Sequence, residues 1–349
     1  AGNRRTWTWS GWVKRNDISL TGYNNAFFLM SRPDGNNDTR CNFQGSNGTE
    51  CISFQNTVGG TDKGRYNTNV SYRDPSAWMH VVIAYDSPQA IVAERLKIYV
   101  NGERQATTET TAIPQDQDSI INKSGDELWV ATSDTSYGIS CIKSNLADVH
   151  FIDGLALTPA AFGSSDSLNV WNPKAFELPT PNDGTTWSGK GSGTLEGGAS
   201  WTSLFDGNTA TSGGAVAASG NTLTWEPDDA ITCSEFAVWC QVEGTGASFK
   251  VNDIEYFPEM KAALGNQTWG WYTFSGLTSL SKVTWNQTSG SNKTQPTAFR
   301  CDSFILTDGQ TDETYTEWAS STSDNVNSFH LKFNDTSSNA ALGTDSLLS

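Results

Sequence analysis

The sequence predicts an all-β protein with two antiparallel β-sandwich (jelly-roll) domains, and three observations lead to this prediction. Aromatic residues are abundant, with 14 Trp, 16 Phe and 9 Tyr against only 3 Met, and such residues suit a pleated, half-buried surface. Gly, Asn and Asp separate the short apolar runs, as expected of turns. No stretch of a dozen residues keeps its apolar positions at helical spacing. The chain has 349 residues, more than one compact all-β domain needs, so we expect two.

Residues 1–163 read as the first sandwich. The segment 6–14 alternates aromatic with small or polar residues, which is typical of a strand with one buried face. Segment 78–86 is nearly continuously apolar, as expected of a central strand. Asn101-Gly102 follows the alternating segment 96–100 and predicts a tight hairpin turn, because both turn residues need positive φ. Further strands are expected at 26–30, 128–131 and 146–152, with turn and loop at 32–48 and one helical turn at 158–162 capped by Thr158.

The rest of the chain divides into three parts. Residues 164–198 are rich in Gly, Pro, Ser and Asn and read as a linker. Residues 199–310 read as a second β-sandwich, and residues 311–349 as a polar tail. The tail holds one short alternating strand at 329–333. If that strand pairs back on the first sandwich, the second domain is an insertion into the first.

The charge balance disfavours a nucleic-acid partner. The net charge is −16, and phosphate neutralisation needs clustered Lys and Arg. One small basic cluster, Arg4, Arg5, Lys14 and Arg15, is interpreted as a solvated edge or an assembly contact. No run of 18 apolar residues occurs, so we expect no membrane insertion. The six cysteines form no CxxC pair and are interpreted as buried thiols, with a Cys41–Cys51 disulfide as the alternative.

Several segments together resemble the concanavalin A-like or laminin-G-like domain of marine phage (cyanophage-like) virion structural proteins. The general segments are residues 7–14 (WTWSGWVK), 78–82 (WMHVV) and 96–102 (LKIYVNG). The more specific ones are residues 146–154 (LADVHFIDG), 157–163 (LTPAAFG) and 329–339 (FHLKFNDTSSN). Residues 204–211 (LFDGNTAT) resemble a discoidin module, which often accompanies such domains as a second sandwich.

This resemblance implies a viral structural protein located in the virion: an appendage, tail-fibre or capsid-decoration subunit. It implies partners among copies of the same chain and other virion proteins, and host surface glycans as a further class of ligand. The alternative is a secreted, carbohydrate-binding, lectin-like protein with the same fold. The fold alone does not decide between a structural protein, a lectin and an enzyme, because glucanases have the same fold.

No catalytic residues are predicted. A retaining glycosidase needs two carboxylates about 5 Å apart on one face, and the first sandwich lacks the usual acidic spacings. Glu255/Glu259 is interrupted by Pro258, while Glu313/Glu317 lies in a polar, turn-like stretch. Asp126 and Glu127 are adjacent and would point to opposite faces. His80 and His150 are interpreted as core or interface residues. We therefore expect a protein that is not an enzyme.

Two kinds of binding site are considered. The loop containing Asp34, Asn36 and Asp38 offers closely spaced oxygen ligands for calcium, the one cofactor considered, although ordinary turn chemistry explains the same residues. Exposed aromatic rings beside amides and carboxylates could bind sugars, and the candidates are Tyr137, Trp269, Trp271 and Trp285. For any one Trp, a place in the core is the competing interpretation.

Overall fold

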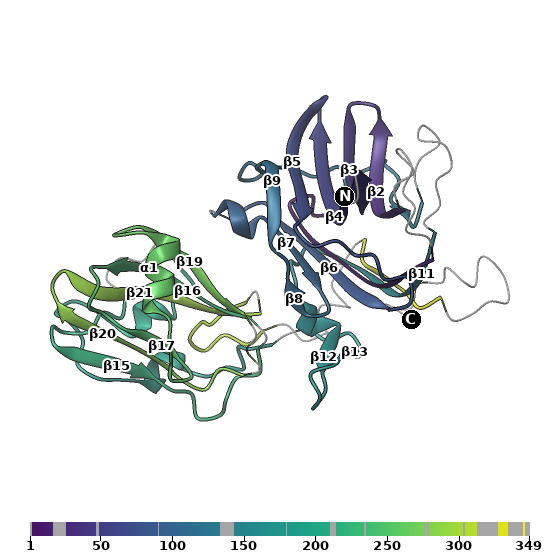
Figure 1. Ribbon diagram of the computed structural model, residues 1–349. Coiled ribbons are helices and arrows are strands. Elements are labelled where there is room, and N and C mark those ends of the chain that lie inside the picture. Colours follow the sequence, from purple (N-terminus) through teal and green to yellow (C-terminus); the bar gives the residue numbers. More distant parts are fainter. Residues whose placement is uncertain are drawn as a thin grey trace. The chain divides into compact units, whose positions relative to one another are not determined.

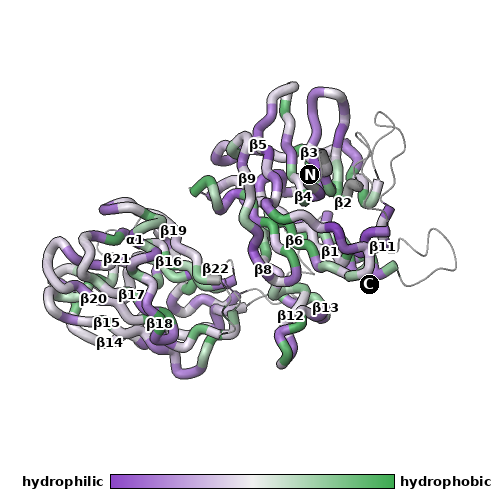
Figure 2. The backbone as a smooth tube through the Cα atoms, in the orientation of Figure 1, coloured by the Kyte–Doolittle hydropathy of each residue, from purple (hydrophilic) through white to green (hydrophobic). Residues whose placement is uncertain are grey.

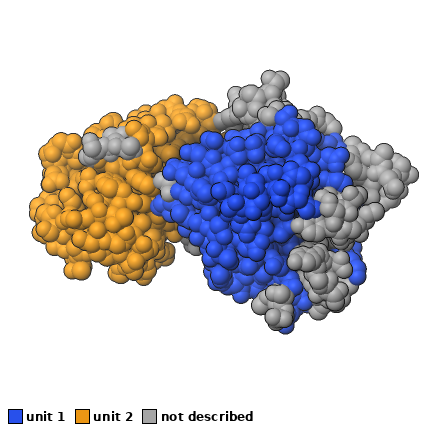
Figure 3. Space-filling model, turned by 90° about the horizontal axis from the view of Figure 1, so that it is seen from above, with its two compact units in different colours: residues 1–175, 315–349 blue, residues 176–314 orange. Residues whose placement is uncertain are grey.

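The computed structural model describes residues 2–16, 26–46, 49–89, 91–132, 143–178, 180–209, 214–233, 235–275, 277, 279–302, 304–312, 327–333 and 345. It divides into two compact units (Figures 1 and 3). Unit 1 comprises Ala1–Ala175 and Tyr315–Ser349, and unit 2 comprises Phe176–Thr314. Unit 2 therefore interrupts unit 1 in the sequence.

Unit 1 contains two six-stranded antiparallel sheets, which confirms the predicted all-β class. Sheet A has the strand order β23 (Phe329–Leu331), β11 (Ser144–Asp153), β1 (Thr6–Arg15), β6 (Met79–Asp86), β7 (Leu96–Val100) and β8 (Glu103–Arg104). Sheet B has the order β10 (Trp129–Val130), β2 (Ala26–Asp34), β3 (Asn37–Ser46), β4 (Thr49–Val58), β5 (Thr61–Thr68) and β9 (Thr107–Thr111). A 3-10 turn, η1 (Val92–Glu94), precedes β7.

The core of unit 1 lies between these sheets. Alternation along β1 turns Trp7 and Trp9 inward, where both are fully buried. Trp7 stacks on Tyr85 of β6 with ring centroids 5.4 Å apart, and Trp9 stacks on Phe28 of β2 at 5.3 Å. Strand β6 is buried along nearly its whole length and forms a hydrophobic stretch of the chain in Figure 2, as expected of a central strand.

The outer face of sheet A is covered by the segment that follows β11. This segment contains η3 (Pro159–Ala161) and the hairpin of β12 (Gly163–Ser165) and β13 (Trp171–Pro173). Trp171 packs so closely that a Cβ at either Gly102 or Gly163 would lie 2.6 Å from its ring. Gly102 also needs φ +84°, which confirms the predicted Asn101-Gly102 turn.

Strand β23 follows unit 2 in the sequence and completes sheet A at its edge. Phe329 lies opposite Phe151 of β11, and His330 lies opposite His150. The first sandwich is thus closed by a strand that comes after the second unit, the arrangement that makes unit 2 an insertion.

Unit 2 is one connected, nine-stranded antiparallel sheet that folds around a single core. Its main path is β14 (Gly191–Ser192), β15 (Asn221–Trp225), β20 (Val283–Ser289), β21 (Asn292–Cys301), β16 (Glu235–Glu243) and β19 (Trp269–Ser275). Short strands β17 (Phe249–Val251), β18 (Ile254–Glu255) and β22 (Phe304–Ile305) pair beside this path. The unit also contains the helix α1 (Phe257–Leu264) and the turns η4 (Trp187–Lys190) and η5 (Thr202–Leu204).

Three local expectations are corrected. Residues 32–48, expected as turn and loop, contain the end of β2 and all of β3, because the polar strand β3 is paired on both sides. The expected linker 164–198 holds β12, β13, η4 and β14 and is shared between the two units. Thr158 precedes η3, but its side chain makes no capping hydrogen bond.

The described cysteines are free thiols, as the sequence indicated. Cys41 lies opposite Phe54 and Cys51 opposite Gln44, so the two thiols are not direct partners across the β3–β4 ladder. Burial raises the pKa of Cys41 and, to a smaller degree, that of Cys51.

Candidate functional site

The outer face of the unit 2 sheet carries a row of tryptophans near the β19 edge. We call Trp239, Trp269 and Trp271 the tryptophan face. Trp271 of β19 lies directly opposite Trp239 of β16, and Trp269 lies opposite Gln241. Two of the predicted sugar-binding residues, Trp269 and Trp271, are thus brought together with Trp239, which the sequence did not single out.

Strand alternation explains why these rings point away from the core. In β16, Val238 and Cys240 belong to the buried core, so Trp239 between them faces outward. In β19, Phe274 is in the core, which turns Trp271 to the opposite face. The ring of Trp269 is 38% exposed, while Trp239 and Trp271 are half-buried.

The rings are held by neighbouring side chains. Trp239 and Trp271 meet edge to face, with centroids 5.7 Å apart and planes at 69°. The guanidinium of Arg300 lies 4.7 Å from the centroid of Trp271 and 3.5 Å from the carboxylate of Glu235. Both charged side chains are about 5% exposed, so they neutralise each other beneath the aromatic surface. Trp239 and Trp271 are therefore supported by packing within unit 2 itself.

The polar neighbours of this face are amides. Gln241 lies opposite Gln295 of β21 and uses its Nε2–H to bond the Gln267 carbonyl at 2.8 Å. Flat aromatic surface flanked by amides suits a ligand with an apolar face and a hydroxylated edge, because the ring supplies contact area and the amides supply donors and acceptors. A sugar ring has this character.

The other predicted glycan residues are placed differently. Trp285 of β20 is fully buried and donates its Nε1–H to the carbonyl of Ala215 at 2.7 Å. Its prediction as a sugar platform is therefore corrected: Trp285 is part of the unit 2 core, packed on Phe249 and Phe299. Tyr137 lies outside the described residues.

The predicted calcium loop is the turn between β2 and β3. The carboxylate of Asp34 accepts the backbone N–H of Asn36 at 2.7 Å and the side-chain amide of Asn37 at 3.0 Å. These bonds, with the nearby Lys123 ammonium as a smaller cause, lower the pKa of Asp34. Asp38 is buried and pairs with Arg40 at 2.8 Å instead of facing Asp34. The local contacts are those of an Asx turn. Across the residues that the structure describes, no group of three or more His, Cys, Asp or Glu side chains could hold a metal ion.

Ser10 and His80 form a contact that resembles a nucleophile and its base. The Ser10 Oγ lies 2.8 Å from His80 Nε2 on the outer face of sheet A. The other ring nitrogen, Nδ1, accepts the Nε1–H of Trp171 at 3.0 Å. Since indole can only donate, this network assigns the proton to Nε2, so His80 donates to Ser10. In this tautomer His80 cannot take the serine proton, and both side chains are almost fully buried.

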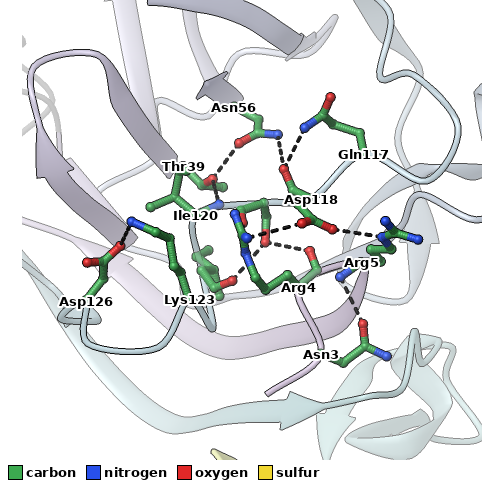
Figure 4. Close-up of polar contacts among 12 residues, drawn as sticks. Asn3, Arg4, Arg5, Thr39, Asn56, Gln117, Asp118, Ile120, Lys123 and Asp126 are labelled. Carbon is green, nitrogen blue, oxygen red and sulfur yellow. Dashed lines mark hydrogen bonds and ion pairs between the residues drawn. The ribbon is translucent and has the colours of Figure 1, made fainter. Parts of the chain in front are cut away.

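Two of the acidic residues considered for catalysis, Glu255 and Asp126, have structural partners. Glu255 accepts the backbone N–H groups of Phe249 and Phe257 at 3.0 Å and so fixes the start of α1. Asp126 pairs with Lys123 at 2.7 Å (Figure 4). Glu313 and Glu317 lie outside the described residues.

The basic cluster at the start of the chain is largely neutralised. In Figure 4, Arg4 and Arg5 both turn toward Asp118, with nitrogen–oxygen distances of 3.1 and 2.8 Å. Arg15 is buried and pairs with Glu50. In the described part of the chain, no helix is both long and apolar enough to cross a membrane.

Comparison with known protein families identifies the kind of domain formed by residues 2–161. Residues 2–161 match the family described as the concanavalin A-like lectin/glucanases superfamily. This part is therefore a concanavalin A-like, laminin G domain. No curated protein sequence matches the chain.

Three solved structures show similarity to parts of the chain. The heptameric SAP-like pentraxin of Limulus polyphemus is 15% identical, with a TM-score of 0.30 over 44% of this chain and 66% of that one. Domain 4 of AbnA, an extracellular arabinanase of Geobacillus stearothermophilus in complex with arabinotriose, is 14% identical, with a TM-score of 0.29 over 45% and 64%. The carbohydrate-binding module CBM66 of Bacillus subtilis is 14% identical, with a TM-score of 0.22 over 31% and 62%. The chain thus spans between 62 and 66% of the length of these three structures.

Proposed function

We propose that this chain acts by binding and not by catalysis, and that it binds carbohydrate through the tryptophan face of unit 2. The observation that carries the proposal is the row of Trp239, Trp269 and Trp271 on one outward sheet face, in which Trp271 packs on Trp239 and on Arg300 of the Arg300–Glu235 pair. The concanavalin A-like domain of residues 2–161 belongs to unit 1 and does not contain this face; its superfamily, which includes lectins, is compatible with a carbohydrate-binding protein.

The ligand is a neutral glycan. The charges under the face cancel, and the chain as a whole has a net charge of −16, which repels acidic polysaccharides at low ionic strength. The tryptophans lie on an open sheet surface, so a chain of sugars could extend along it. We propose that sugar binding does not require calcium, because the Asp34 carboxylate already accepts hydrogen bonds from Asn36 and Asn37 within its own turn.

The setting we propose is a phage particle, in which the chain is an appendage, tail-fibre or capsid-decoration subunit that contacts other copies and other virion proteins. This part rests on the sequence of residues 146–163 and 329–339, which resembles phage virion proteins. A secreted lectin-like protein is the second candidate, and the same tryptophan face supports it. Electron microscopy of purified particles separates the two: an ordered array of this chain in phage particles supports the virion, and recovery of the chain only as a secreted protein outside any particle supports the lectin.

Glycan binding is tested with the full chain on a glycan array, followed by calorimetry with the best ligand. We expect Trp239→Ala or Trp271→Ala to weaken binding roughly 30-fold, since a central tryptophan at an interface contributes about 2 kcal/mol. Trp78→Ala is the matched control, because Trp78 is 41% exposed but belongs to unit 1. The glycan affinity of Trp78→Ala should equal that of the wild type, and EDTA should leave the glycan affinity of the wild type unchanged.

Two results would contradict this proposal. One is a wild-type protein that binds no glycan on the array. The other is a pair of face variants that bind as well as Trp78→Ala does. Release of reducing sugar from a bound polysaccharide would separately overturn the assignment as a non-enzyme.

A further inference from the structure

The three histidines of the chain all lie on strands of sheet A, and two of them, His150 and His330, are in direct contact. His80 is on β6, His150 on β11 and His330 on β23, although His150 and His330 are 180 positions apart in the sequence. The pairing of β23 with β11 sets His330 directly opposite His150. The cluster exists only while this edge strand is docked.

The contact between His150 and His330 is close and parallel. Their ring centroids are 3.8 Å apart with the planes at 13°. His330 Nε2 lies 3.3 Å from the carboxylate of Asp148, and His150 Nδ1 lies 3.1 Å from the Asp148 carbonyl. Phe162 packs on the His150 ring at 5.2 Å. His150 is therefore enclosed partly by the segment after β11 and partly by β23.

In the described part of the chain, β23 is a three-residue strand at the edge of sheet A, and its Phe329 and Leu331 pack against the core of unit 1. Its register covers three residue pairs, and Phe329 stacks on Phe151 with centroids 5.7 Å apart. The backbone N–H of Asp153 donates to Ser328 Oγ at 2.8 Å, and that of His330 donates to the Asp345 carboxylate at 2.9 Å. A short edge strand held in this way can open locally while the sandwich stays folded.

Charge affects the docked strand mainly through His150. The pKa of His150 is lowered to about 3, chiefly by burial, with smaller lowering effects of His330 and His80 and an opposing effect of Asp148. Two other charged groups lie near the pair. Lys332 contributes to lowering the pKa of Asp148, and the carboxylate of Asp345 accepts the backbone N–H of His330. The docked strand thus encloses a histidine that resists protonation.

The sign of the pH effect follows from this shift. Lifting β23 removes one stacked ring from His150, so the pKa of His150 rises toward its usual 6.5. Docking is then strongest above pH 6.5 and weakens as the pH falls toward 3. The hydrogen bond from His330 lowers the pKa of Asp148, so this contact persists through that window. Its attraction is small because the Asp148 side chain is 46% exposed.

We propose that β23 is an acid-released clasp: protonation of His150, which stacks on His330 of this strand, frees β23 from sheet A while the sandwich remains folded. Release uncovers the β11 edge, which is then available for pairing with another strand. This inference concerns unit 1 and is independent of sugar binding by unit 2.

Hydrogen–deuterium exchange of the full chain at pH 7.5 and 5.0, with labelling times scaled for the intrinsic exchange rates, tests the clasp. We expect protection in residues 327–333 to fall by roughly 30-fold at pH 5.0, since each pH unit below 6.5 changes the open-to-docked ratio by up to tenfold. Strands β1 and β6 should remain far better protected than β23 at both pH values. His150→Phe, which keeps an aromatic ring in place, should abolish the acid effect in β23.

Two controls define the mechanism. His80→Gln removes another buried histidine that does not contact β23, so β23 should remain acid-labile. Phe329→Ala weakens docking by packing alone, so β23 should exchange quickly at both pH values. Equal protection of 327–333 at the two pH values overturns the clasp, as does opening of β23 only together with β1 and β6. An acid response that survives in His150→Phe also overturns it. The wild-type comparison decides the question even if that variant does not fold.

Discussion

Replacing Glu50 with alanine should lower the free energy of unfolding of unit 1 by about 3–5 kcal/mol, because it leaves a buried cation without its partner. The Arg15 side chain is 1% exposed and donates to the Glu50 carboxylate at 2.5 Å and to the Tyr72 carbonyl at 2.6 Å. Its guanidinium also lies 4.4 Å from the Phe43 ring centroid. Arg15 is the last residue of β1 in sheet A and Glu50 is the second residue of β4 in sheet B, so the pair joins the two sheets at one end of the sandwich.

Native-state hydrogen exchange in β1 and β6 at increasing urea concentration measures this change in unit 1 alone, which matters because a chain of two units need not unfold in one step. Glu50→Gln keeps an acceptor and should cost less than Glu50→Ala. The double variant Arg15→Met, Glu50→Leu removes both charges and should recover most of the loss. A loss under about 1 kcal/mol in Glu50→Ala would mean that water reaches the guanidinium and that the pair is not a buried one.

The sequence predicts where the strands of this protein lie better than it predicts which face of each strand is buried. The alternation in residues 6–14 and the Asn101-Gly102 turn depend on local chemistry, and β1 and the hairpin after β7 follow from them. Strand β3 was not recognised because its polar residues resemble a loop. It becomes a strand through pairing with β2 and β4, which local composition does not report.

The same limit explains the tryptophan assignments. Trp271 and Trp285 both lie in alternating strands, and both faces of β19 carry aromatic rings. Which face is buried depends on the neighbouring strands: Val283 and Trp285 face the core with Phe249, whereas Trp271 faces outward with Trp239. Trp239 could have been proposed from its place between the core residues Val238 and Cys240, once residues 235–242 were predicted as a strand. The histidine cluster could not have been proposed from the sequence, because it depends on pairing between His150 and His330, which are 180 positions apart.

Acidification should destabilise unit 1 as a whole through His80, separately from the release of β23. Burial lowers the pKa of His80 to about 3 from the usual 6.5, because the ring is enclosed by Trp12 and Trp171. A group whose pKa is lower in the folded state stabilises that state fully above its unfolded value and loses this contribution as the pH falls. Each pH unit below 6.5 removes about 1.4 kcal/mol, so His80 alone should cost unit 1 about 3 kcal/mol at pH 4.5.

The variant that isolates this effect is His80→Gln. Its amide oxygen can accept the Trp171 Nε1–H and its NH₂ can donate to Ser10 Oγ, as the imidazole does in its assigned tautomer. The free energy of unfolding of unit 1 is measured by hydrogen exchange in β1 and β6 at pH 7.5 and at pH 4.5. Between these two pH values, His80→Gln should lose about 3 kcal/mol less of this free energy than the wild type loses. Parallel pH profiles in wild type and His80→Gln would show that His80 becomes protonated within the folded sandwich. Nδ1 of His80 would then carry a proton and could no longer accept the Trp171 Nε1–H, while Nε2–H would still donate to Ser10 Oγ.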